Sequence, residues 1–271
     1  LPRRKGRSFC SGPRPRSTRA SSRTGRSPTR SRTSPHSYDG YFLLGSQDYD
    51  IRAAAPRPGE KAVNTAKLYN VAYFFTPHGD QFAEYRKTRL VMLGEFLPFG
   101  DTFPWLREWA GIGLDFSPGP GPVIFTLKDP PFRLAPLICF EDTIPEVANR
   151  AAALGPDAFV TITNDGWYTG WCAAWGVRQH LNHAVFRCVE HDRPMIRCAN
   201  TGISCLIDQN GTVAQRYTGP GGAPIDVGGV FAGTLAMHPV QATLYERWGD
   251  WIVLISAFVS VMLGVRLLRR A

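Results

Sequence analysis

The 271-residue sequence has no acidic residue before Asp39, and this absence separates a tail from the rest of the chain. Residues 1–36 contain eleven of the 31 basic residues, set among Ser, Pro, Thr and Gly with almost nothing apolar. The other 20 basic residues are balanced by 22 acidic ones, so the remainder has no basic face that predicts nucleic-acid binding. The tail also lacks an apolar run of seven residues, which excludes the centre of a signal peptide within it.

The sequence has no C-x-x-C pair and no H-E-x-x-H motif. Without such pairs, a disulfide framework and a zinc site are both excluded, and we expect no metal and no cofactor. Cys188, Cys198 and Cys205 are expected to be core thiols, or to form one disulfide if the domain lies in an oxidising compartment. The cysteines are Cys10, Cys139, Cys172, Cys188, Cys198 and Cys205, and the histidines considered as ligands are His180, His183 and His191.

Three regions follow from composition. Residues 1–37 are predicted to be a disordered basic tail, because so little apolar surface cannot offset the entropy of ordering. The tail is interpreted as a solvated arm or a segment outside the native reading frame, with an arm that binds RNA or anionic lipid as the alternative. Residues 38–246 are predicted to form one folded domain, and residues 247–271 an apolar helix.

Short β-rich runs alternate with single helical stretches and hairpins through the folded region, a pattern typical of a layered α/β sandwich. The expected strands are Tyr41–Leu44, Tyr69–Phe75, Gln81–Lys87, Val123–Leu127, Leu134–Ile138, Ala158–Thr163, Met195–Ala199, Ile203–Asp208 and Thr212–Tyr217. The expected helices are Pro145–Leu154 and Trp175–Glu190, and Arg52–Gly59 is expected to be a loop.

The chain is organised around Cys139, which ends the apolar run Leu134–Ile138. Thr143 is predicted to cap a helix that begins at Pro145 and is closed by Gly155. A thiol on such a strand-to-helix turn lies near helix-terminal N–H groups that favour negative charge. The alternative is a buried structural thiol.

Two further charged residues stand out. The hairpin delivers Lys87 to the end of a strand, and Glu95 lies in the apolar, Pro- and Gly-broken loop Leu90–Phe103. A buried loop carboxylate needs partners. Taken without its context, Lys87 would be interpreted as a solvated hairpin lysine, and the alternative for Glu95 and Glu141 is a helix-cap or salt-bridge role.

The C-terminal stretch Ile252–Val265 is fourteen residues without a charge, preceded by Trp248 and Trp251 and followed by an Arg-rich end. Fourteen residues suit a core helix, whereas counting to Leu268 gives a length close to a membrane span. The aromatic and basic flanks favour a transmembrane helix with its Arg-rich end in the cytoplasm and the domain on the outer face.

The ordered motifs resemble the nitrilase (carbon–nitrogen hydrolase) superfamily and, within it, the apolipoprotein N-acyltransferase family. The motifs are Tyr85–Lys87, Gly94–Pro98, Leu137–Glu141, Thr163–Trp167, Gln179–His180, Arg193–Pro194, Arg197, Asn200–Ser204, Thr243–Tyr245 and Gly249–Trp251. The resemblance implies a nitrilase-like α-β-β-α sandwich, incomplete at the N-terminus, with a C-terminal transmembrane helix.

The resemblance also implies a Glu-Lys-Cys triad that transfers a fatty acyl chain from phospholipid to the N-terminal amine of a diacylglyceryl-cysteine lipoprotein through a thioester on Cys139. In the implied mechanism, Lys87 would favour the thiolate and, with the backbone N–H of Phe140, would stabilise the oxyanion. Glu95 and Glu141 match additional functional carboxylates that hold the Lys87 ammonium and shape the pocket. Asn164, Asp165 and Trp167 are expected to shape the loop beside the nucleophile, with Asn164 and Trp167 on the substrate side. The implied setting is a monomer in the bacterial inner membrane, with its catalytic domain facing the periplasm and no nucleic-acid partner.

One departure from the family pattern concerns the general base, a glutamate expected on an early strand. No glutamate precedes Glu60, and Glu60 lies in a Pro/Gly-rich loop. We therefore expect a chain truncated or frame-disrupted at its N-terminus, lacking its base and inactive alone. The competing interpretations are a soluble amidase or nitrilase acting on small amides, and a non-catalytic remnant with a binding arm.

Overall fold

The structure is a computed structural model that describes residues 40–53, 64–100, 102–103, 105–110, 115–128, 131–168 and 173–269. The predicted tail, Glu60, Cys10 and Cys172 lie outside these residues. The strands are β1 (Phe42–Ala53), β2 (Asn64–Phe75), β3 (Gln81–Arg86), β4 (Phe125–Lys128), β5 (Pro131–Ile138), β6 (Ala158–Thr163), β7 (Met195–Ala199), β8 (Cys205–Ile207) and β9 (Val213–Arg216). The helices are α1 (Trp105–Ala110), α2 (Pro145–Ala152), α3 (Ala173–His191), α4 (Leu244–Trp248) and α5 (Trp251–Leu268), with 3₁₀ turns η1 (Cys139–Thr143), η2 (Asp165–Trp167) and η4 (Pro220–Gly222).

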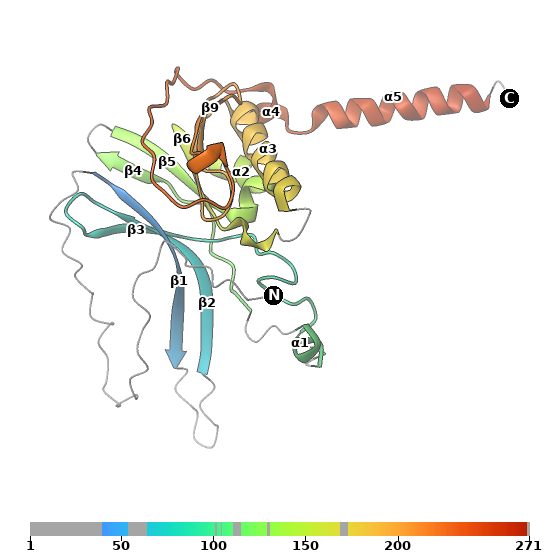
Figure 1. Ribbon diagram of the computed structural model, residues 1–271. Helices are drawn as coiled ribbons and strands as arrows, with labels where there is room; N and C mark the ends of the chain where they lie inside the picture. The colour runs from blue at the N-terminus through green and yellow to red at the C-terminus, as the bar shows by residue number, and fades with distance from the viewer. Residues whose placement is uncertain are drawn as a thin grey trace.

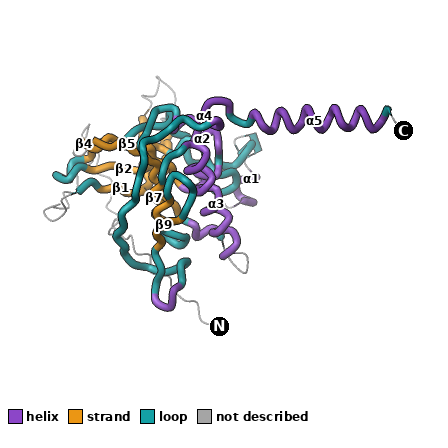
Figure 2. Tube along the Cα trace, turned by 90° about the horizontal axis from the view of Figure 1, so that it is seen from above, coloured by secondary structure: helices purple, strands orange, loops and turns teal. Residues whose placement is uncertain are grey.

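The domain is built in layers around two sheets (Figure 1). One sheet has the order β1-β2-β3, and the other has the order β4-β5-β6-β7-β8-β9. Helices α2 and α3 lie together on one side of the strands (Figure 2). The α/β sandwich expected from the sequence is therefore confirmed as an α-β-β arrangement within the described part of the chain.

Alternation along the central strands explains why the larger sheet has two buried faces. On β5, Ala135 and Leu137 join the core formed with α2 and α3, whereas Leu134 and Ile138 join the core formed with β2 and β3. Successive strand residues point to opposite faces, so a sheet covered on both sides reads as a continuous apolar run. The apolar run that ends at Cys139 is thus a central strand.

The first hairpin is longer than its apolar residues indicate. The expected strand Tyr41–Leu44 is extended to Ala53, so Arg52 and Ala53, expected in a loop, belong to β1. Every residue of β1 pairs with β2, from Phe42 opposite Phe75 to Ala53 opposite Asn64. Backbone pairing, rather than burial, carries the strand through its polar half, which is why an apolar pattern misses it.

The Cys139 turn differs in one detail from the sequence prediction. Ile144, not Thr143, is the N-cap of α2, and it makes no side-chain cap. The chain forms the 3₁₀ turn η1 directly after β5, and there the Thr143 hydroxyl donates to the Phe140 carbonyl at 2.8 Å. Pro145 at the helix start is confirmed, and Gly155, with φ of 68°, follows its end.

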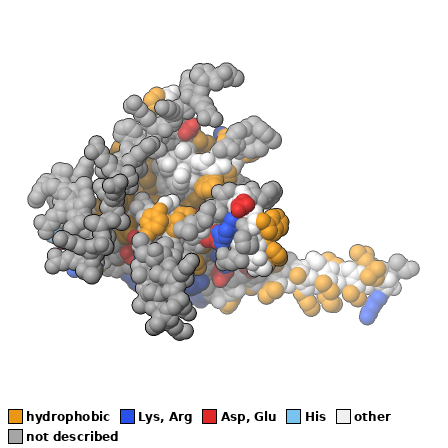
Figure 3. Space-filling view, turned by 90° about the horizontal axis from the view of Figure 1, so that it is seen from below, with side chains coloured by type: hydrophobic (Ala, Val, Ile, Leu, Met, Phe, Trp, Pro, Cys, Tyr) orange, Lys and Arg blue, Asp and Glu red, His pale blue; other side chains and the backbone are white. Residues whose placement is uncertain are grey.

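Helix α5 extends away from the domain (Figure 1). Among the described residues it is the one helix long and apolar enough to cross a membrane, with a mean hydropathy of 2.2 and none of its residues buried. Apolar side chains run along it, with a basic side chain near its far end (Figure 3). Helix α5 therefore contributes no residue to the core of the described domain.

Candidate active site

The site lies where the central parallel strands end. Strands β5, β6 and β7 run parallel and are followed by Cys139, Asn164 and Asn200. Parallel strands present their carboxyl ends at one edge of a sheet, so residues distant in sequence meet there. The Asn200 side chain donates to Asn164 Oδ1 at 3.3 Å, which ties two of these strand ends together.

Cys139 occupies a backbone conformation that is rare for a residue with a side chain. Its φ is 53°, its thiol is free and it is partly buried. Holding a non-glycine residue in the left-handed region costs about 1–3 kcal/mol, and such strain concentrates at functional sites. The fold therefore maintains a sharp turn at the residue that the sequence predicts as the nucleophile.

Lys87 and Glu95 form a buried ion pair. Lys87 follows β3, and its Nζ lies 2.8 Å from Glu95 Oε1, with side-chain exposures of 0% and 10%. The Asn70 side chain also donates to Oε1, and the Val91 N–H donates to Oε2 at 2.8 Å. The loop carboxylate thus has the partners its burial requires, and it compensates an ammonium that has no access to water.

Glu141 lies in the same region but does not hold Lys87, contrary to expectation. Its carboxylate accepts from the N–H of Thr88 at 2.7 Å, of Arg89 at 3.0 Å and of Ile138 at 2.8 Å, and from the Tyr85 hydroxyl at 2.9 Å. Burial raises the pKa of Glu141, and the amide donors oppose that rise. Glu141 therefore joins the segment after Lys87 to the strand before Cys139.

The remaining predicted residues surround this turn. Phe140 and Trp167 are exposed, by 39% and 68%. Asn164 Oδ1 accepts from the Gly166 N–H at 3.1 Å and so shapes the turn that carries Trp167. A Cβ placed on Gly94 would lie 3.7 Å from the Trp167 ring, so this ring covers the loop that holds Glu95.

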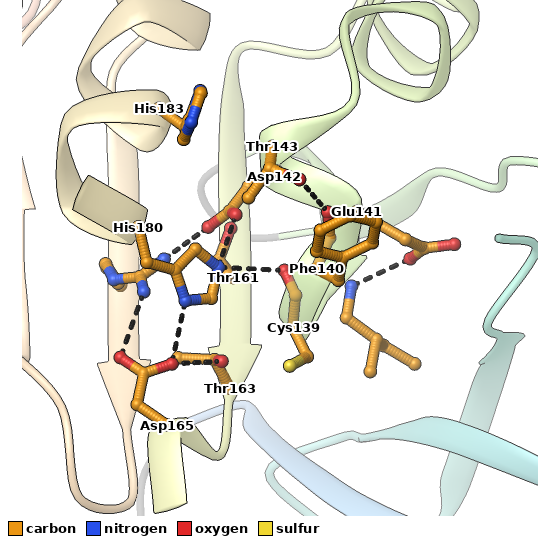
Figure 4. Close-up of polar contacts among 12 residues, drawn as sticks. Cys139, Phe140, Glu141, Asp142, Thr143, Thr161, Thr163, Asp165, His180 and His183 are labelled. Carbon is orange, nitrogen blue, oxygen red and sulfur yellow. Dashed lines mark hydrogen bonds and ion pairs between the residues drawn. The ribbon is translucent and has the colours of Figure 1, made fainter. Parts of the chain in front are cut away.

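The sequence argument missed a buried ionic cluster beside Cys139. His180 Nδ1 lies 2.8 Å from Asp165, and His180 Nε2 lies 2.7 Å from Asp142. Arg197 pairs with both carboxylates, and all four side chains are buried. Figure 4 shows the His180 ring between the two acids, with the Cys139 carbonyl directed towards it. The sequence signal that could have predicted this cluster was the pair of acids, Asp142 and Asp165, that follow two neighbouring parallel strands.

The cluster sets the charge of His180. Burial alone lowers the pKa of the imidazole, but the hydrogen bonds to Asp142 and Asp165 outweigh it and raise the pKa to about 9. For Asp165, burial is likewise outweighed, and the His180 and Arg197 contacts lower its pKa. The folded cluster thus pairs two cations with two anions at neutral pH.

Neither a metal site nor the expected base is found among the described residues. They contain no group of three or more His, Cys, Asp or Glu side chains that could hold a metal ion. Before Lys87, the described glutamate is Glu84, which pairs with Arg86 at 3.1 Å and is 37% exposed. It neighbours Tyr85 on β3 and so faces the opposite side of that strand.

Comparisons with known proteins agree on one family. Residues 45–221 match the sequence model described as carbon-nitrogen hydrolase. The chain is 34% identical to the "Apolipoprotein N-acyltransferase" of Geobacter metallireducens over 76% of this chain and 38% of that protein. It is 30% identical to the protein of the same name from Bdellovibrio bacteriovorus, over 76% and 37%. The chain therefore spans about two fifths of the length of these relatives.

Among solved structures, the chain is similar to an amidase from Nesterenkonia sp. AN1. That similarity has a TM-score of 0.43 and 18% identity, over 69% of this chain and 60% of that chain.

Proposed function

The chain belongs to the carbon–nitrogen hydrolase family, and from that premise we propose that it transfers a fatty acyl chain from a phospholipid to the N-terminal amine of a diacylglyceryl-cysteine lipoprotein. One observation carries the proposal. Glu141 joins the central strand that ends at the strained Cys139 to Thr88, the residue after Lys87, and Lys87 forms a buried ion pair with Glu95. The relatives named apolipoprotein N-acyltransferase supply the substrate class.

The first step would acylate Cys139. The thiolate attacks the phospholipid ester carbonyl, and a tetrahedral oxyanion forms. Its collapse breaks the ester C–O bond, releases the lysophospholipid as an alkoxide that takes up a proton, and leaves a thioester on sulfur. Lys87 would favour the thiolate and, with the Phe140 N–H, stabilise the oxyanion.

The second step would transfer the acyl group. The lipoprotein amine attacks the thioester, loses a proton and becomes an amide, while Cys139 leaves as a thiolate. Glu95 would keep Lys87 charged and in place. Neither Glu95 nor Glu141 is proposed as the general base, because their oxygens already accept hydrogen bonds. Glu95 accepts from Asn70, Lys87 and Val91, and Glu141 accepts from backbone N–H groups that include that of Ile138.

The surface around the site suits an apolar substrate. Trp167 is exposed beside the Glu95 loop, and the same loop exposes Met92, Leu93 and Phe99 by 60% or more. Apolar side chains that stay exposed in this number indicate an apolar partner rather than water. We propose that Trp167 and Asn164 line the path of the acyl chain and its ester.

Helix α5 provides the membrane context of the proposal. Trp248 and Trp251 pack against each other at its start, and Arg266 and Arg269 lie at its end. Aromatic residues favour the membrane interface, and basic residues favour the cytoplasmic side. The helix would then anchor the domain on the outer face of the inner membrane, close to phospholipid.

The direct test is a thioester. The chain is purified in detergent, incubated with phosphatidylethanolamine vesicles and digested, and the Cys139 peptide is examined by mass spectrometry. Although the described residues supply no general base, Lys87 would favour the thiolate, so in place of the inactive chain expected from the sequence we expect an added acyl mass on Cys139 that hydroxylamine removes and that Cys139→Ala lacks. An unmodified Cys139 peptide together with release of ammonia from small amides would instead support an amidase, and the proposal would be wrong.

A further inference from the structure

The peptide group between Cys139 and Phe140 has a fixed environment on one side. His180 Nε2 lies 3.4 Å from the Cys139 carbonyl oxygen and 2.7 Å from Asp142 Oδ1. One N–H can be shared between two acceptors in this way. Figure 4 shows the carbonyl oxygen directed towards the His180 ring, with the sulfur away from that contact.

Geometry alone requires His180 to donate from both ring nitrogens. Nδ1 faces Asp165 at 2.8 Å and Nε2 faces Asp142 at 2.7 Å. Ionised carboxylates only accept hydrogen bonds, so a ring held between two of them is protonated on both nitrogens. The Cys139 carbonyl therefore lies next to a cationic donor.

Four elements hold that donor in place. Asp142 lies on η1, Asp165 on η2, His180 on α3 and Arg197 on β7. The Thr163 hydroxyl donates to Asp165 at 2.9 Å, and the Tyr168 ring lies edge-on to His180 at 6.2 Å. A buried network with this many partners fixes one side-chain geometry.

The planarity of the peptide bond converts this contact into an orientation. In a trans peptide the carbonyl and the N–H point in opposite directions from one rigid plane. When the Cys139 carbonyl is directed to His180, the Phe140 N–H must point away from the cluster. The adjacent cation also polarises the peptide and strengthens the N–H as a donor.

We propose that His180, held between Asp142 and Asp165, is a positioning residue that orients the Cys139–Phe140 peptide so that the Phe140 N–H donates to the oxyanion. This inference rests on the proposed acyl-transfer function. The cluster's two cations and two anions cancel, so it adds little net charge at the sulfur. Its effect is on the tetrahedral oxyanion and not on the amount of thiolate.

That distinction gives the test two reactions of the same sulfur. Iodoacetamide alkylates a thiolate by direct displacement without forming an oxyanion, whereas p-nitrophenyl butyrate acylates it through a tetrahedral oxyanion. Both rates are measured on the Cys139 peptide by mass spectrometry, with the full chain in detergent. The variants are His180→Gln, Asp165→Asn as a milder change that keeps the side-chain shape, and His183→Gln as a control on the same helix.

We expect His180→Gln to slow acylation about tenfold or more while alkylation changes less than about twofold, since losing an oxyanion donor outright costs roughly 100-fold or more. The acylation rate of Asp165→Asn should lie between those of His180→Gln and the wild type, and the rate of His183→Gln should match that of the wild type. Equal losses in both reactions in both cluster variants, or no loss in either, would overturn the inference while leaving acyl transfer intact. A wild-type chain that is alkylated but never acylated would overturn the proposed function and this inference together.

Discussion

Glu141 accepts a hydrogen bond from the Thr88 N–H at 2.7 Å and so joins the residue after Lys87 to the turn that begins with Cys139. Its second oxygen accepts from the Ile138 N–H at 2.8 Å, directly before Cys139. This one buried carboxylate therefore joins two backbone segments, at Thr88 and at Ile138, that are about 50 residues apart in the chain. The relative position of ammonium and sulfur depends on this connection.

Replacing Glu141 with Gln should therefore destabilise the domain. The amide NH₂ would face N–H donors on whichever side it is placed, so at least one donor loses its acceptor. We expect a loss of about 2–4 kcal/mol in the free energy of unfolding, measured by urea titration. Glu84→Gln, which removes the charge from a partly exposed pair with Arg86, should cost less than about 1 kcal/mol. Equal effects of the two changes would contradict this account.

The Lys87–Glu95 pair should show strong coupling. Glu95→Gln leaves the ammonium buried without its counter-charge and should cost about 3–5 kcal/mol. Adding Lys87→Met should recover part of that stability, because the uncompensated charge is then gone. Acylation of Cys139 should not recover in this double variant, because the Lys87 ammonium is absent. The double-mutant cycle by urea unfolding checks the first expectation, and additive costs would show that the two side chains act independently.

His180 should make stability fall at alkaline pH. Burial opposes charge on the ring, but Asp142 and Asp165 raise its pKa to about 9, against about 6.5 when unfolded. The folded state holds this proton more tightly, so the contribution is complete below about pH 6.5 and is lost as the pH rises through about 9. Urea midpoints at pH 6, 8 and 9.5 should decline in the wild type and in His183→Gln. A decline of the same size in His180→Gln would assign it to another group.

His191 should act in the opposite direction. Burial, followed by the charges of Arg193 and Arg187, lowers its pKa to about 4. The folded state therefore binds this proton less readily than the unfolded chain, and stability should decrease as the pH falls from about 6.5 towards 4. The ring packs edge-on against Phe159 and Tyr245, so His191→Phe should keep the packing and flatten the acid side of the stability profile. An unchanged acid profile in His191→Phe would contradict the assignment.

Helix α5 should decide where the chain fractionates. We expect the full chain to sediment with membranes and to resist extraction at alkaline pH. Leu254→Arg and Val259→Arg together should weaken insertion, at about 2.5–3.5 kcal/mol for each arginine near the centre of a span. Ser46→Arg adds one arginine on β1, outside the helix, and should leave the chain in the membrane fraction. A wild-type chain that stays in the supernatant would contradict the membrane assignment.

Much of this protein was determined by its sequence. The apolar run before Cys139, and the proline and glycine that bracket the next helix, reflect local chemistry and appear in the structure as predicted. The uncharged C-terminal stretch is helical as predicted, and its place in a membrane stays a prediction. The strand end at Lys87 and the need of Glu95 for a partner were equally local. These features depend on residues that are neighbours in the chain.

Only the tertiary structure decided the rest. It paired Lys87 with Glu95, gave Glu141 to the backbone instead of to the ammonium, and gathered His180 with acids from two strand ends. Such contacts depend on strand order and register, which bring together residues far apart in sequence and which no local pattern records. The polar half of β1 shows the same limit, because its partner strand and not its own composition makes it a strand.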